Sequence, residues 1–186
     1  MRANAPGARK VAGERKNGPA AAADGRIRLE CPSMGRPTAA DREWMTRALA
    51  AARRADRLGE VPIGAVAVLD GKLLATAANR TTRALDPTAH AEVLAVRRAA
   101  QRLGNHRLAG VTLYVTLEPC LMCIGAMVQA RIGRLVFGAR DPKVGGTRYL
   151  RSARVQRGLN HRFPVLGGVL ADEAAALLKG FFAARR

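Results

Sequence analysis

Apolar and polar positions first take on a regular pattern after Thr38. Small and apolar residues recur at helical intervals from Met45 to Ala52. Thr38 and Asp41 have the spacing of a capping box, which satisfies free backbone N–H groups where a helix begins. The pattern therefore predicts a helix over residues 39–58.

Two short apolar runs follow this helix, "IGAVAVL" at 63–69 and "KLLATAA" at 72–78. Asp70-Gly71 lies between them, and this dipeptide is a strong hairpin signal because its type I′ turn needs positive φ at both positions. We therefore expect two antiparallel strands.

Helical and strand patterns alternate over the rest of the chain. The expected elements are a helix over 88–104, a strand over 111–117, a helix over 120–133, strands over 134–139 and 164–170, and a helix over 171–184. A hairpin followed by this alternation implies an α/β sandwich, in which helices flank a mixed sheet of five strands.

Residues 1–38 lack both periods and are rich in Ala, Gly, Arg and Pro. We expect a disordered basic extension there, with eight basic and three acidic residues, followed by one domain over 39–186. A transit peptide is less favoured because such segments avoid acids, and translation from Met34 would remove most of the extension. Cys31 lies in this segment and is assigned no role.

The formal net charge of +18 favours a polyanionic partner such as nucleic acid, although arginines scattered over solvated faces are the alternative. No apolar run approaches the ~20 residues that span a bilayer, so no membrane association is expected. With three cysteines and no signal-peptide pattern, a reducing, cytoplasmic location is expected.

Four residues suggest a chemistry. Cys120 and Cys123 alone fit a redox pair, half of a zinc site or two buried small groups, while His90 and Glu92 singly are more often ordinary polar residues. Together they place one His and two Cys at the starts of two helices that flank one strand. Three such ligands are typical of a catalytic zinc with an open fourth position. The four residues match the H-x-E…P-C-x-x-C signature of zinc nucleobase deaminases.

Further segments extend this match, namely "VPIGAV", "DPTAHAE", "TLYVTLEPCLMCIGAM" and "RIGRLVFGARDPKVG". Over residues 41–184 the chain resembles the bacterial tRNA-specific adenosine deaminases. The resemblance implies a three-layer, cytidine-deaminase-like fold, a homodimer, and conversion of adenosine to inosine at the wobble position of a tRNA anticodon. It also implies one Zn²⁺ per chain, held by His90, Cys120 and Cys123.

The resemblance also assigns roles to individual residues. Zinc would lower the pKa of a water molecule to ~7, and Glu92, which is not a ligand, would move protons between that water and the purine. Asn79 matches the residue that hydrogen-bonds the flipped base, and Ile63 matches an apolar wall of its pocket. Asp141 and Lys143 match substrate contacts.

Basic residues are concentrated late in the chain, with nine Lys or Arg and one acid over 131–162. Arg148, Arg151, Arg154 and Arg157 recur every three residues and would form a stripe if that segment is helical. The segment departs from the family pattern, so its role is inferred locally: Arg148 and Arg151 are expected to contact the anticodon stem-loop.

Two other functions remain possible at this stage. A deaminase of free guanine, cytosine or deoxycytidylate would use the same zinc chemistry but would not need the basic segment. A non-catalytic, zinc-stabilised RNA-binding module would have no use for Glu92. Riboflavin-pathway deaminases share the "HAE" motif but are usually joined to a reductase domain.

Overall fold

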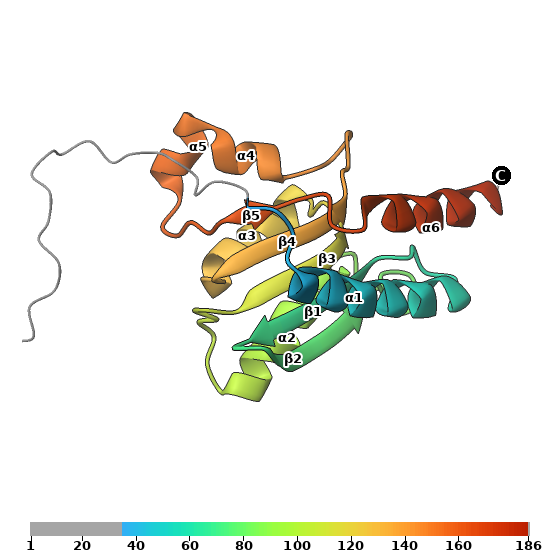
Figure 1. Ribbon diagram of the computed structural model, residues 1–186, viewed down its shortest axis with the longest axis horizontal. Coiled ribbons are helices and arrows are strands. Elements are labelled where there is room, and N and C mark those ends of the chain that lie inside the picture. Colours follow the sequence, from blue (N-terminus) through green and yellow to red (C-terminus); the bar gives the residue numbers. More distant parts are fainter. Residues whose placement is uncertain (1–34, 186) are drawn as a thin grey trace, which may run out of the picture.

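The computed structural model describes residues 35–185 and contains one mixed sheet with the strand order β2-β1-β3-β4-β5 (Figure 1). The strands are β1 (Gly64–Leu69), β2 (Lys72–Ala78), β3 (Thr112–Leu117), β4 (Arg134–Ala139) and β5 (Val165–Leu166). β1 pairs antiparallel with both β2 and β3, whereas β3, β4 and β5 run parallel to one another. The expected five-stranded mixed sheet is confirmed.

Helices cover both faces of this sheet and make the fold a three-layer sandwich (Figure 1). They are α1 (Ala39–Arg57), α2 (Ala91–Leu103), α3 (Leu121–Ala130), α4 (Thr147–Arg151), α5 (Ala153–Gly158) and α6 (Ala171–Ala183). Successive strand residues point to opposite faces. Thus Val66 of β1 packs in one core cluster with Met45 of α1, and Ala65 packs in another with Ala95 of α2 and Met127 of α3.

Two local signals in the sequence are confirmed at the level of the backbone. The Thr38 hydroxyl accepts from the Asp41 N–H, and the Asp41 carboxylate accepts from the Thr38 N–H, so the capping box is complete. Asp70 and Gly71 both have positive φ, 48° and 71°, as a type I′ hairpin turn requires.

The start of α2 differs from the expectation, because the helix begins at Ala91 and not near Thr88. Asp86 Oδ1 accepts from both the N–H and the hydroxyl of Thr88, which commits residues 86–88 to a turn. The Ala91 N–H is instead satisfied by the side chain of Asn79, twelve residues earlier in the chain. The extended backbone of His90 follows from this arrangement.

The predicted arginine stripe does not lie on one continuous helix. Ser152 has extended backbone angles and separates α4, which carries Arg148 and Arg151, from α5, which carries Arg154 and Arg157. The strand expected over 164–170 is also shorter, since β5 has only two residues. Cys31 and most of the predicted extension lie outside the described residues. Within residues 35–185, no helix combines the length and apolarity needed to span a membrane.

Candidate active site

Three potential metal ligands lie together where α2 and α3 begin. His90 Nδ1 is 3.7 Å from Cys120 Sγ and 3.5 Å from Cys123 Sγ, and the two sulfur atoms are 3.7 Å apart. Cys123 is buried, and the other two side chains are half-buried. This geometry allows the three side chains to bind one metal ion.

The fold brings these side chains together by aligning two helix starts beside β3. His90 is the N-cap residue of α2, and Cys120 is the N-cap residue of α3. Cys123 is three residues further on and therefore shares a helix face with Cys120. Both helices pack on the same side of the sheet, and their free N–H groups and dipoles favour negative charge on the sulfur atoms.

The electrostatics of the cluster also favour a bound cation. Hydrogen bonds from Cys123 and His90 lower the pKa of Cys120 to about 4. The hydrogen bond with Cys120, together with burial, raises the pKa of Cys123, and the bond to Cys120 raises the pKa of His90. One thiolate therefore disfavours a second beside it. A metal ion bound by both sulfur atoms would supply the positive charge that two thiolates need.

Glu92 lies in the first turn of α2, next to this cluster, and only 4% of its surface is exposed. Its Oε2 atom has no hydrogen-bond partner among the described residues. Burial is the main reason that the pKa of this carboxyl is raised. A buried carboxylate oxygen without a partner is costly to a fold, so Glu92 is a candidate functional residue.

Asn79 and Ile63 are neighbours beside the start of α2. The Asn79 N–H donates to the Ile63 carbonyl at 3.0 Å, and Asn79 Oδ1 accepts from the Ala91 N–H at 2.8 Å. This second bond fixes the side-chain amide, so its Nδ2 group is the part left to donate to a ligand. Ile63 is half-buried and packs against the core cluster that includes Cys123.

Asp141 and Lys143 lie on the loop that follows β4. Asp141 Oδ1 accepts from the N–H groups of Lys143 and Val144, at 2.9 and 3.1 Å, so this carboxylate shapes its own loop. The side chain of Lys143 is exposed. The same loop reaches the metal-ligand cluster at Gly145, whose backbone forms a bridge with Cys120.

Glu118 holds this loop in place, a role that the sequence analysis missed. Its buried carboxylate accepts from the Asp141 N–H at 3.2 Å and from the Thr147 hydroxyl. A side chain at Gly145 would lie 2.6 Å from the Glu118 carboxyl carbon, so only glycine fits there. A charged residue between a buried strand and the first cysteine of the "PCLMC" segment is the signal that could have identified it.

A second buried glutamate orders the loop between β2 and α2. Glu60 is 1% exposed and accepts from the N–H groups of Thr82 and Arg83 and from the Thr81 hydroxyl. Its three donors lie 21 to 23 residues away in the sequence, so no local pattern could have indicated the contact.

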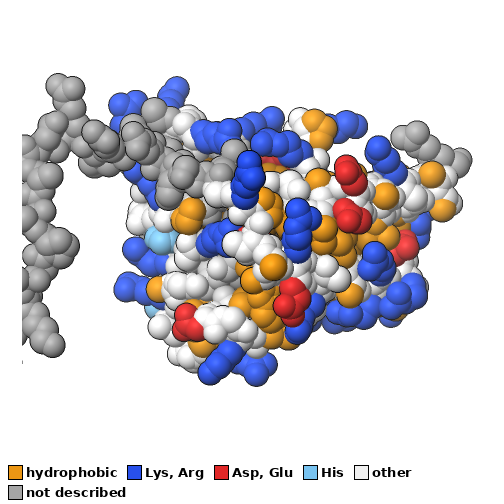
Figure 2. Space-filling model, in the orientation of Figure 1, with side chains coloured by type: hydrophobic (Ala, Val, Ile, Leu, Met, Phe, Trp, Pro, Cys, Tyr) orange, Lys and Arg blue, Asp and Glu red, His pale blue; other side chains and the backbone are white. Residues whose placement is uncertain are grey.

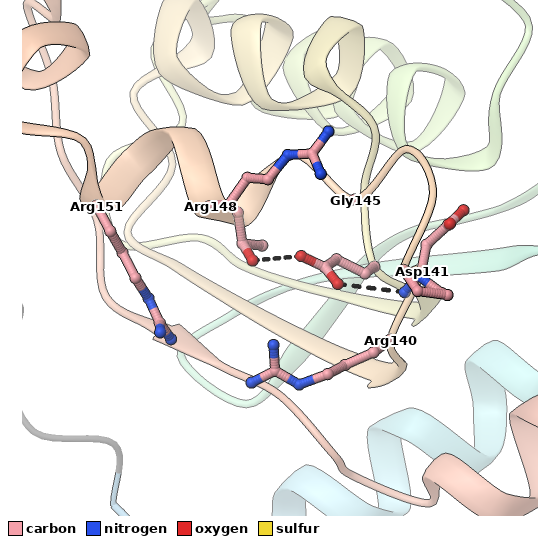
Figure 3. Close-up of a pocket in the computed structure, with 8 residues that line it drawn as sticks. Arg140, Asp141, Gly145, Arg148 and Arg151 are labelled. Atoms are coloured by element: carbon pink, nitrogen blue, oxygen red, sulfur yellow. Dashed lines mark hydrogen bonds between the residues drawn. The ribbon is translucent and has the colours of Figure 1, made fainter.

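Arg148 and Arg151 are exposed residues of α4 and line an open cavity of about 290 Å³ (Figure 3). Asp141 and Gly145 line it as well. The cavity is separate from the His90, Cys120 and Cys123 cluster, because none of these three residues lines it. The structure therefore groups the metal-ligand cluster with Glu92, and it places Asp141, Arg148 and Arg151 around a basic cavity beside that cluster. Lys143 does not line this cavity, and Asn79 and Ile63 lie beside the start of α2.

Comparisons with known proteins agree on one family. The MafB19-like deaminase family matches residues 39–186. A tRNA-specific adenosine deaminase of Bacillus subtilis is 44% identical over 142 residues, which are 76% of this chain and 88% of that protein.

Solved structures of two kinds of deaminase are similar to this chain. A structure from work on A-to-I editing by tRNA:A34 deaminases has a TM-score of 0.69 and 46% identity, covering 73% of this chain and 99% of that one. A guanine deaminase from Nitrosomonas europaea has a TM-score of 0.67 but 28% identity, covering 80% of this chain and 87% of that one. The chain therefore belongs to the MafB19-like deaminase family and, by its closer sequence similarity, to the tRNA-specific adenosine deaminases.

Proposed function

We propose that this protein converts adenosine to inosine, by hydrolysis, at the wobble position of a tRNA anticodon. The observation that carries the proposal is the unpartnered Glu92 Oε2 atom beside the His90, Cys120 and Cys123 cluster. The identity of 44% to a tRNA-specific adenosine deaminase supports adenosine in tRNA as the substrate.

Zinc is the metal that the ligand set fits. Tetrahedral zinc with bonds of ~2.3 Å to sulfur and ~2.0–2.1 Å to nitrogen separates two sulfur ligands by about 3.8 Å, and a sulfur from a nitrogen by about 3.6 Å. The corresponding separations here are 3.7 Å between the sulfur atoms and 3.5 to 3.7 Å from sulfur to His90 Nδ1. We propose one zinc ion per chain, with its fourth position left open for chemistry.

Bound zinc would supply the acidification of water that provides a nucleophile at neutral pH. The protein's own contribution begins with Glu92, whose Oε2 would accept one proton from water and deliver it to purine N1. The same carboxylate would then take the second proton from the hydroxyl group added at C6 and deliver it to the departing amine, which leaves as ammonia. Asn79 Nδ2 would donate to an acceptor on the base, held in direction by the bond from Ala91 N–H to Oδ1. Ile63 would form an apolar wall against the ring.

The partner that fits this site is an unpaired nucleotide, because C6 of a stacked and paired adenine is inaccessible. We propose the anticodon stem-loop of a tRNA, with Asp141 and Lys143 on the loop beside Cys120 contacting nucleotides that flank the adenosine. A homodimer is part of the same proposal, supported by the resemblance to the family.

The test is inosine formation in a synthetic anticodon stem-loop with adenosine at the wobble position. Wild-type protein should form inosine and release ammonia, and it should not act on free guanine, which is the substrate suggested by the guanine deaminase similarity. Activity on guanine without activity on the stem-loop would refute the proposal.

Two variants separate the assigned roles. Glu92→Gln should retain about one zinc per chain and lose turnover, because the amide cannot accept the proton. Cys123→Ala should lose the metal as well as the activity. Metal analysis of the purified variants, beside the inosine assay, measures both. Full activity of Glu92→Gln would overturn the role of this carboxylate.

A further inference from the structure

The basic cavity beside the metal-ligand cluster contains two arginines that face each other. Arg140 extends from the end of β4 and Arg151 from α4, and their guanidinium groups point toward one another across the cavity (Figure 3). Both side chains are exposed, and neither forms an ion pair with another residue that the structure describes. Arg148 points away from this pair and interacts with the ring and hydroxyl of Tyr149.

The two carboxylates that line the cavity are already engaged. Glu118 accepts from the Asp141 N–H and the Thr147 hydroxyl, and Asp141 Oδ1 accepts from the N–H groups of Lys143 and Val144. Neither carboxylate forms an ion pair with Arg140 or Arg151 among the residues that the structure describes. Two converging guanidinium groups repel each other unless an anion lies between them. The arrangement therefore has the charge and direction of an anion site.

A phosphate group is the anion that suits this geometry. Guanidinium groups are planar forks that bind phosphate oxygens through paired hydrogen bonds, and two forks can hold one phosphate from two sides. The cavity also adjoins the site of chemistry, because Gly145 lines it and pairs through its backbone with Cys120. A phosphate held there would belong to a nucleotide close to the one that reacts.

We propose that Arg140 and Arg151 form a clamp for one backbone phosphate of the RNA, next to the adenosine that is deaminated. The proposal rests on the proposed function and adds a defined subsite to it. Of the four arginines in the predicted stripe, only Arg151 belongs to this clamp. Figure 2 shows that Lys and Arg side chains are spread widely over one face of the protein, so a general electrostatic attraction is the competing explanation.

The experiment combines variants with RNA in which one phosphate is made neutral. The clamp variant changes both Arg140 and Arg151 to Gln. Arg154→Gln with Arg157→Gln on α5 removes the same charge from residues that do not line the cavity. A second control changes Arg53 and Arg57 of α1 to Gln, which removes the same charge from a different helix. Each protein is assayed on anticodon stem-loops that carry a single methylphosphonate at successive positions around the adenosine.

The clamp variant should raise KM roughly tenfold, with kcat and metal content little changed. It should lower the slope of log Kd against log salt by about 0.7, because the two arginines bind one phosphate of a single strand. Each control pair should have a smaller effect. One methylphosphonate position should weaken binding to wild-type protein but add nothing for the clamp variant, because its partner is already missing.

The outcomes distinguish this inference from the proposed function. No inosine with unmodified RNA and wild-type protein would refute the proposed function itself. Normal inosine formation with equal losses for the clamp and control pairs would establish diffuse attraction and overturn the clamp. Full additivity at every methylphosphonate position would also overturn it.

Discussion

Glu118 offers the sharpest test of how the site is held together. Its carboxylate joins the end of β3 to the loop after β4 by accepting from the Asp141 N–H and the Thr147 hydroxyl. Two substitutions separate shape from hydrogen bonding. Glu118→Gln keeps the size of the side chain, whereas Glu118→Ala removes both acceptors and leaves two donors without partners.

The structure sets the expected size of each effect. In Glu118→Gln, the amide oxygen can still accept from the Asp141 N–H while the amide nitrogen donates to the Thr147 oxygen, so only charge assistance is lost, about 1 kcal/mol. In Glu118→Ala, the stranded Thr147 hydroxyl costs about 1–3 kcal/mol, because Thr147 is only 6% exposed. The stranded Asp141 N–H costs less, because Asp141 is half-buried and water can reach it. We expect a total loss of about 3 kcal/mol in the free energy of unfolding.

Urea unfolding measures the free energy of unfolding of each variant and shows whether Glu118→Ala loses more than Glu118→Gln. The total zinc concentration is kept the same throughout, because bound metal also stabilises the folded state. Thr147→Val supplies the matched control, because it removes one donor at constant shape. Combined with Glu118→Ala, it should cost less than the sum of the two single changes. Equal losses of unfolding free energy for the Gln and Ala variants would refute the conclusion that the hydrogen bonds of Glu118 hold this loop in place. Strict additivity of Glu118→Ala and Thr147→Val would refute it as well.

Two further predictions concern parts of the protein away from the site. A chain that begins at Met34 keeps the Thr38 capping box of α1 and should therefore retain its urea midpoint and its activity on the stem-loop; a loss of turnover by the folded protein would contradict this. Burial alone would raise the pKa of Asp41, but hydrogen bonds from Arg134 and Thr38 outweigh burial and lower it. The Asp41 carboxylate therefore stabilises the fold fully at pH values above its pKa in the unfolded chain, ~3.9. This stabilisation is lost as the pH falls through the lower pKa that Asp41 has in the folded protein. Arg134→Gln should destabilise the protein at pH 7, and the difference in urea midpoint from wild type should shrink below about pH 4; a constant difference would contradict the reasoning.

The sequence predicted those features whose cause is local. Asp70 and Gly71 indicated a hairpin because both positions of its turn need positive φ, and the capping box was visible in the spacing of Thr38 and Asp41. The candidate metal ligands were also predictable, because each belongs to a short motif at a helix start. Their convergence required only that two helices flank one strand.

The contacts that the sequence analysis missed join residues that are far apart in the chain. Glu118 accepts from groups 23 and 29 residues later, and nothing near it in the sequence specifies them. Arg140 was not singled out, because its partner across the cavity lies on α4 and the pairing depends on where Glu118 holds the loop. The break between α4 and α5 at Ser152 was equally hidden, since neither proline nor glycine marks it.

The start of α2 shows how metal binding and helix capping compete for the same residue. An N-cap side chain normally accepts from an N–H group of the first turn. His90 occupies this position but makes no such bond, because its ring is directed to Cys120 and Cys123. Asn79 accepts from the Ala91 N–H instead, from outside the helix. The amide that caps α2 through its oxygen is thus the one we propose to contact the base through its nitrogen. Replacing Asn79 by Ala would remove both contacts. Asp would keep the acceptor that caps α2 and lose the donor, but it would also add a negative charge, so comparing Asn79→Asp with Asn79→Ala separates the capping contact from the contact to the base.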